Sequence, residues 1–244
     1  MSRSLERTED HNRYQRAYFE GALKKTMVPR ASRYLRRHAK ELLRFGEITP
    51  RDRVLELGCG MGRYTVLLAE MGFAVEGLDF SPVLLERLRA YGGGGRPIPL
   101  HCADIADPPP VLTGAFDVAA GFFVLHHLED LPRVFGAVAR LLKPGGRVVF
   151  LEPNPYNPLY YLQIAMTPGM TWRGDRGILK MRRGVIFGAL QEAGFGHARL
   201  ERFGFFPPFL ADREGGARLE SSLERLSLLR GLLPFQLFRA ERLG

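Results

Sequence analysis

The chain has 244 residues, of which 45% are hydrophobic and 25% are charged. This composition is ordinary for a globular protein, and the length suits one sizeable α/β domain with insertions. No apolar run approaches the ~20 residues that a membrane span requires, and the first residues lack a signal-peptide core, so we expect a cytoplasmic protein. Cys59 and Cys102 do not have metal-ligand spacing, so neither a disulfide framework nor a metal site is expected.

The formal net charge is +9, and residues 1–53 hold 14 Lys and Arg against 7 Asp and Glu, a surplus of 7. Such a surplus suits RNA, a phosphate-bearing substrate or an anionic membrane surface. No RNA-recognition signature accompanies the charge, and arginines spaced along a helix usually form a solvated face. A solvated face is therefore the stronger interpretation, and nucleic-acid binding the weaker one.

Two helices are predicted at the start of the chain. Residues 10–27 carry Tyr14, Tyr18, Phe19 and Leu23 at roughly helical spacing, and residues 31–45 repeat the pattern. The two are separated at Val28-Pro29.

A strand over residues 53–57 is predicted to lead through a glycine-spaced loop into a helix over residues 64–71. Glycines at 58, 60 and 62 allow a sharp turn and a close approach to a ligand, while the new helix presents free N–H groups. The spacing is G-x-G-x-G, so it departs from the dinucleotide fingerprint, which places its third glycine three positions after the second.

The stretch from Glu56 to Gly62 resembles the first motif of class I S-adenosylmethionine (SAM)-dependent methyltransferases. The resemblance implies a SAM site with S-adenosylhomocysteine as product, and it assigns cofactor contacts to Glu56, Gly58, Cys59, Gly60 and Tyr64. In such proteins the segment before the first strand often folds over the pocket, which makes Tyr14 and Tyr18 candidate lid and substrate residues. Core packing is the alternative for both tyrosines.

A second strand is predicted over residues 74–78 and ends at Asp79. About 20 residues after the glycines, an acidic residue at this place reaches the ribose hydroxyls of an adenosyl ligand, and we assign Phe80 to the same site. The alternative role for Asp79 is helix capping. Because Ser81-Pro82 supplies its own N-cap and first helical residue for a helix over residues 82–91, the ribose role is favoured.

A surface turn at residues 92–95 and a third strand over residues 97–102 come next. The strand delivers Ala103-Asp104-Ile105, which resembles the adenine-contacting segment of the family. The resemblance implies that Asp104 accepts a hydrogen bond from the exocyclic amine and that Ile105 packs the ring.

A fourth strand is predicted over residues 115–121 and continues into Phe122 and the pair His126-His127. The phrase from Phe116 to Leu128 resembles small-molecule and quinone-type methyltransferases. Ligands bind at the carboxyl ends of parallel strands, so Gly121 and Phe122 should line the cofactor pocket. The histidines are catalytic candidates, with a structural role as the alternative.

A helix over residues 132–142 and a fifth strand over residues 147–151 precede a proline-stiffened loop. Glu152, Asn154 and Tyr156 in this loop are candidates for positioning the acceptor or for acid–base catalysis. In the alternative interpretation, their side chains merely satisfy backbone groups.

Two insertions are predicted in the last third, near residues 155–183 and 205–233, with a helix over 184–193 and a strand over 197–203 between them. The first insertion contains Trp172, a candidate substrate contact. The second has a leucine stripe that suits either packing on the lid or peripheral contact with a membrane. The resemblance implies that the last strand, residues 233–239, pairs antiparallel at the sheet edge.

The motifs together predict a Rossmann-like, doubly wound, seven-stranded α/β sheet, mostly parallel with an antiparallel last strand and helical lid insertions. We expect one domain over residues 1–244, with a helical cap (1–50), a SAM-binding half (51–152) and a substrate half (153–244). The predicted activity is in-line methyl transfer to a small, apolar or aromatic metabolite, with His127 as the preferred base where one is needed.

Two alternatives to this activity stay open. One is a methyltransferase on a prenylated quinone or lipid at the membrane surface, and the other is a non-catalytic, RNA-binding or assembly module. The sequence does not predict the oligomeric state or the acceptor atom.

Overall fold

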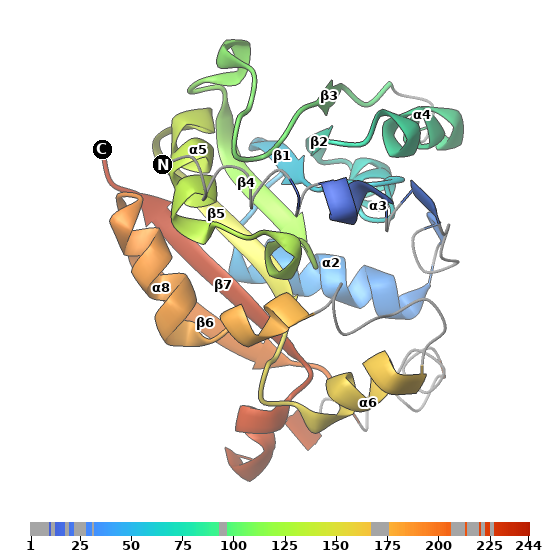
Figure 1. Ribbon diagram of the computed structural model, residues 1–244, viewed down its shortest axis with the longest axis vertical. Coiled ribbons are helices and arrows are strands. Elements are labelled where there is room, and N and C mark those ends of the chain that lie inside the picture. Colours follow the sequence, from blue (N-terminus) through green and yellow to red (C-terminus); the bar gives the residue numbers. More distant parts are fainter. Residues whose placement is uncertain are drawn as a thin grey trace.

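The computed structural model describes residues 10, 13–17, 20–21, 28–30, 32–92, 97–166, 176–205, 213, 220, 223–224 and 227–244. Tyr18 and Trp172 lie outside the described residues. The fold is a seven-stranded sheet with helices on both faces (Figure 1), which confirms the predicted fold class.

The sheet has the strand order β3-β2-β1-β4-β5-β7-β6. Its parallel part consists of β3 (Leu100–Cys102), β2 (Ala74–Asp79), β1 (Arg53–Leu57), β4 (Phe116–Phe122) and β5 (Leu142–Pro153). The last two strands, β7 (Phe235–Arg242) and β6 (Phe195–Phe203), pair antiparallel with their neighbours as far as residues are described.

The expected position of the last strand is wrong. β7 lies between β5 and β6, so β6 forms the edge of the sheet. Burial explains the arrangement, because Leu237, Phe238 and Ala240 on β7 are almost inaccessible to solvent, as an interior strand requires.

Several strand boundaries also differ from the predicted ones, most clearly the starts of β3, β5 and β6. β3 begins at Leu100 and not at Pro97, because Pro97 and Pro99 have no N–H to donate to a ladder. β5 begins at Leu142, the last residue of the predicted helix and five residues before the predicted strand, and β6 begins at Phe195 and not at His197.

Two hydrophobic layers hold the helices against the sheet. On one face, α2 (Arg33–Phe45) and α3 (Thr65–Glu70) pack through Leu42 and Leu68, and α4 (Pro82–Tyr91) adjoins α3. On the other face, α5 (Leu131–Leu141) and α8 (Arg183–Glu192) pack through Phe135 and Ile186 (Figure 1).

The helix starts follow from local sequence. Ser32, Ser81 and Asp130 cap α2, α4 and α5 by accepting a hydrogen bond from the backbone N–H three residues later. Pro82 occupies the first turn of α4, as predicted.

Shorter elements connect these layers: η2 (Pro110–Leu112), η3 (Leu125–His127), α6 (Pro158–Met166), η4 (Arg176–Lys180) and η5 (Ser227–Leu232). In the portion of the chain that the structure describes, no helix combines the length and apolarity needed to cross a bilayer.

Candidate functional site

The glycine loop joins β1 to α3 at the carboxyl edge of the sheet. Gly58, Gly60 and Gly62 have φ angles of 68°, 53° and 85°, in the left-handed region that favours glycine. A Cβ on Gly58 would lie 2.4 Å from Val124 Cγ2, whereas one on Gly60 would meet nothing within 4 Å. The loop is therefore tightly packed at Gly58 and has free space next to Gly60, which leaves room for a ligand there.

Asp79, at the end of β2, is tied to this loop. Its Oδ2 accepts from Gly60 N at 2.8 Å and its Oδ1 from Ser81 N at 2.9 Å. Burial raises the pKa of the Asp79 carboxyl, while these N–H donors oppose the rise. Ser81 caps α4 through its own hydroxyl, which accepts from Leu84 N, so Asp79 is not needed as the cap. Its ribose role stays a prediction.

Glu56 on β1 lies beneath the loop and is 2% exposed. Burial raises its pKa to about 8; the Thr65 side chain opposes the rise, and the charge of Asp79 adds to it. Among the described residues, no hydrogen bond reaches Glu56 Oε2. A buried carboxylate oxygen without a donor is costly, and a cationic ligand group would relieve that cost.

The carboxyl end of β3 brings the predicted adenine segment beside Asp79. Ala103 N donates to the Asp79 carbonyl at 3.0 Å, and Asp104 Oδ1 accepts from Ala106 N at 2.8 Å. Ile105 is buried in the core cluster of the α5 face. Core packing therefore accounts for Ile105, and the adenine contacts of this segment stay predictions.

An aromatic stack closes the other side of the loop. The rings of Tyr64 and Phe122 are stacked with centroids 3.9 Å apart and planes 6° apart. The next residue, Phe123, has a φ of 57°, which is strained for a side chain of this size. Gly121 is required because a Cβ there would lie 2.6 Å from Phe150.

His38 on α2 completes this region, and sequence reasoning missed it. Its Nδ1 lies 2.8 Å from the Tyr64 hydroxyl, and its ring is 4.6 Å from Phe235 and 5.7 Å from Phe203. Burial, followed by the charges of Arg63 and Arg37, holds the pKa of His38 well below its ordinary value. No local signal marks this group, because its members come from α2, β6 and β7.

The predicted catalytic residues His126 and Glu152 meet in the interior. Glu152 Oε2 lies 2.7 Å from His126 Nδ1, and Glu152 Oε1 accepts from Val124 N and Leu125 N at 2.8 and 2.7 Å. Glu152 is 0% exposed. Both carboxylate oxygens are therefore occupied in shaping the turn, which agrees with the backbone-satisfying interpretation.

His127 lies on the same turn and is half-buried, with its ring centroid 3.9 Å from that of His126. η4 covers the turn closely, since a Cβ on Gly177 would lie 1.7 Å from His126 O. Lys180 Nζ clamps the two segments by donating to Glu129 O and Oε2, each at 3.0 Å.

The loop after β5 separates its two other candidates. Asn154 is 0% exposed, and its Nδ2 donates to Gly231 O and Leu233 O at 2.9 and 2.8 Å, which positions the end of the second insertion. Tyr156 is 52% exposed, and its ring lies 5.9 Å from the Arg202 guanidinium. The structure therefore does not bring these two side chains together.

The amino-terminal segment contacts the loop after β2, and its role as a cap stays a prediction. Arg16 Nη2 donates to Phe80 O at 2.9 Å, and the Ser81 hydroxyl donates to Glu20 Oε1 at 2.6 Å. Tyr14 is half-buried.

Ion pairs hold the described part of the second insertion against α2. Glu220 and Glu224 pair with Arg37 and also accept from Phe205 N and Gly204 N. Packing on the fold is therefore what these contacts favour for this insertion.

Comparison with known proteins bears on the assignment. Residues 30–195 match the model of a methyltransferase domain family. An uncharacterized methyltransferase of Synechocystis is 33% identical over 126 residues, 50% of this chain and 58% of the relative. A ubiquinone biosynthesis O-methyltransferase of Xanthomonas oryzae is 33% identical over 103 residues, covering 42% of this chain and 43% of the relative. The chain thus matches about half the length of these relatives.

Among solved structures, a SAM-dependent methyltransferase of Thermotoga maritima, described as a possible histamine N-methyltransferase, superposes with a TM-score of 0.65. It shares 18% identity and covers 93% of this chain and 99% of its own. At this identity the likeness shows the fold. The family match spans more than half of the chain, so the chain belongs to the methyltransferase domain family, and its recognition as a class I SAM-dependent methyltransferase is confirmed.

Proposed function

We propose that this protein transfers the methyl group of SAM to a small, apolar or aromatic metabolite. The observation that favours this acceptor class is the group of aromatic rings near the carboxyl edge, in which the half-buried Phe123 and Phe235 pack beside the buried Tyr64–Phe122 stack. Pockets for planar apolar ligands are lined mainly by such rings.

The residues beneath the loop fit the donor. SAM supplies an activated sulfonium methyl group together with an ammonium, a carboxylate and two ribose hydroxyls. The unpartnered Glu56 Oε2 suits a cation, Asp79 suits hydroxyl donors, and the open face above Gly60 gives access. The start of α3 behind the loop presents N–H groups toward an anion.

The chain's contribution to the chemistry is mainly positioning. An acceptor atom held in line needs little further help when it is already unprotonated. For a protonated acceptor we assign the general base to His127, because Glu152 and His126 are bonded to each other and nearly inaccessible.

A prenylated quinone or lipid acceptor is the second candidate, and it is favoured by the ubiquinone biosynthesis O-methyltransferases among the relatives. Flotation with anionic liposomes separates the two candidates. A metabolite enzyme stays in solution, whereas a lipid enzyme floats and loses flotation when residues 205–233 are removed.

The donor site is tested by isothermal titration with S-adenosylhomocysteine. Asp79→Asn should weaken binding about 10- to 100-fold, because a buried hydrogen bond to a charged group contributes about 1.5–3 kcal/mol. Asp117→Asn removes a carboxylate at the opposite edge of the sheet and should leave the affinity unchanged. Unaltered binding by Asp79→Asn would refute the assignment.

The acceptor is found by incubating the protein with methyl-labelled SAM and an extract of the source organism. Label in a small aromatic or apolar compound supports the proposal. Label in lipid favours the second candidate, and no label combined with salt-sensitive RNA binding favours a non-catalytic module.

A further inference from the structure

A groove follows the outer side of the edge strand β6, away from the glycine loop. Its volume is about 660 Å³, and it is lined by residues of α2, α8 and β6 and by Glu47 just after α2: Arg44, Phe45, Glu47, Arg183, Ala198, Arg199, Leu200, Glu201 and Arg202. Within the described residues β6 pairs only with β7, so this side of the sheet has no covering strand. The groove is large enough for a small molecule.

The charges that line the groove are unbalanced. Four arginines face two glutamates, and both glutamates already have cationic partners. Glu201 pairs with Arg44, and Glu47 lies 2.5 Å from Arg239 Nη1. The chain therefore supplies no uncommitted carboxylate to the groove in the part that the structure describes.

Arg202 is the residue of the groove whose buried polar groups are least satisfied within the described chain. Its side chain is half-buried, and its Nε has no hydrogen-bond partner among the described residues. Burial lowers the pKa of its guanidinium; Tyr156 opposes this shift, and the nearby charge of Arg183 adds to it. A buried donor without an acceptor, beside a like charge, is unfavourable unless an anion binds there.

The two arginines are already held in place. The guanidinium of Arg202 lies 5.9 Å from the Tyr156 ring, and that of Arg183 lies 5.0 Å from the Phe187 ring. Stacking on rings restrains the guanidinium planes and leaves their N–H groups available at the edges. Such preorganised groups bind phosphate bidentately.

The amino terminus of α8 adds an electrostatic field that favours an anion. Arg183 is the first residue of this ten-residue helix, its N-cap Arg182 makes no side-chain capping bond, and its first turn has no acidic residue. Helix N-termini attract anions through unpaired N–H groups and the helix dipole.

We propose that this groove binds a phosphate-bearing small molecule, with the phosphate held between Arg183 and Arg202. Arg202 lies on β6, separated from β1 and its glycine loop by three strands, β7, β5 and β4. The site does not use the methyl donor, so it stands or falls independently of the proposed methyl transfer.

The test is calorimetric titration of the full chain with inorganic phosphate and with phenyl phosphate, at constant ionic strength. Arg202→Gln and Arg183→Gln should each weaken binding about 10-fold or more, as loss of a charge-assisted hydrogen bond predicts. Arg202→Lys should also weaken it, because lysine keeps the charge without the planar fork. The matched control is Arg89→Gln, which removes an exposed charge from α4 and should change nothing.

S-adenosylhomocysteine titrations of the same variants should match the wild type, which separates this site from the donor site. Tighter binding of phenyl phosphate than of phosphate supports a phosphate-bearing small molecule, whereas equal affinity overturns that assignment in favour of free phosphate. Absence of saturable binding, or equal weakening by Arg89→Gln and Arg202→Gln, overturns the site altogether. Since Arg183 is exposed, its variant remains informative even if Arg202→Gln fails to fold.

Discussion

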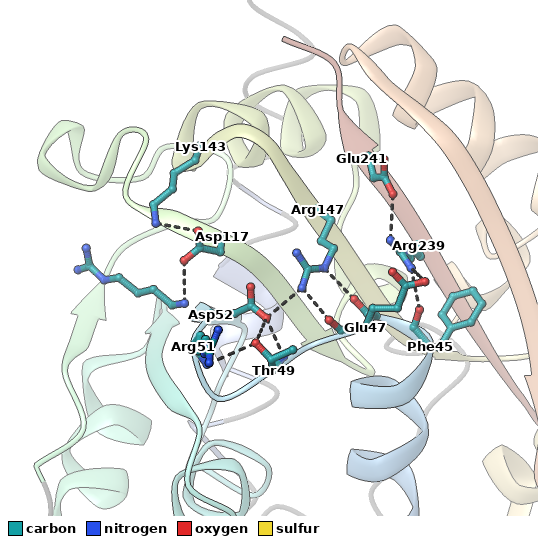
Figure 2. A network of polar contacts seen from close by, with 12 residues as sticks. Phe45, Glu47, Thr49, Arg51, Asp52, Asp117, Lys143, Arg147, Arg239 and Glu241 are labelled. Atoms are coloured by element: carbon teal, nitrogen blue, oxygen red, sulfur yellow. Dashed lines mark hydrogen bonds and ion pairs between the residues drawn. The ribbon is translucent and has the colours of Figure 1, made fainter.

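The two ends of the parallel strands differ in how their polar groups are paired. We call the end where these strands begin the amino edge, and the end where they finish the carboxyl edge. At the amino edge, charged side chains bridge neighbouring elements near the surface (Figure 2). Arg147 donates to Gly46 O, Glu47 O and Asp52 Oδ2 at 2.7, 2.9 and 3.0 Å, and Lys143 pairs with Asp117 at 2.7 Å. These groups find their partners within the chain.

At the carboxyl edge, groups are buried without such complete pairing. Glu56 Oε2 has no donor within the described residues. Such unfavourable features persist where a ligand or a reaction uses them. The paired charges at the amino edge therefore stabilise the fold. The incompletely paired Glu56 at the carboxyl edge lowers the stability of the fold and leaves a group that can bind a ligand.

The largest expected loss of stability tests Glu152, a carboxyl-edge group whose two oxygens are both paired within the chain. Glu152→Ala leaves Val124 N, Leu125 N and His126 without their acceptor and should lower the free energy of unfolding by about 3–5 kcal/mol, measured by urea denaturation. Glu241→Ala at the amino edge removes a partly exposed partner of Arg239 and should cost about 0.5 kcal/mol. Equal losses would contradict the comparison.

Glu56 should make stability depend on pH. Its folded pKa of about 8 exceeds the ordinary value of 4.5, so between these values the folded state binds the extra proton and stability falls as pH rises. Glu56→Gln should remove this slope and gain roughly 5 kcal/mol over wild type above pH 8. Denaturation at several pH values measures it. Glu86→Gln, at an exposed position, should keep the wild-type slope.

Two glycines with similar φ angles allow the cost of backbone strain to be measured apart from the cost of steric overlap. Gly62→Ala at the carboxyl edge would place Cβ 2.0 Å from Leu88 Cδ1, whereas Gly145→Ala near the amino edge meets nothing within 4 Å. Since both have positive φ, each should lose about 1–2 kcal/mol, and Gly62→Ala about 1–3 kcal/mol more for overpacking. Thermal denaturation compares them. Similar melting temperatures of the two variants would show that the Leu88 side chain moves aside at little energetic cost.

The smallest effect concerns the surface pair Lys143–Asp117. Lys143→Met should lower the free energy of unfolding by about 0.5 kcal/mol, because exposed ion pairs contribute little. Binding of S-adenosylhomocysteine should not change. A weakened affinity would mean that the two edges are coupled, which their separation argues against.

Local sequence was sufficient for most elements and for the turns that carry the predicted donor residues. The glycines of the loop, Ser81-Pro82 and the acidic end of β2 are signals carried by neighbouring residues, since turns, caps and strand ends depend on the nearest few positions. Strand order was partly wrong, because pairing of β7 with β5 and β6 depends on which surfaces can be buried together.

The sequence by itself determined the family, the donor motif and the alternation of strands and helices, because these follow from short-range geometry. Only the tertiary structure showed that Glu152 serves the His126 turn, that His38 meets Tyr64, and that Arg183 and Arg202 share a groove. Each of these groupings joins residues far apart in the chain. The packing of whole elements decides such contacts, and no local pattern records it.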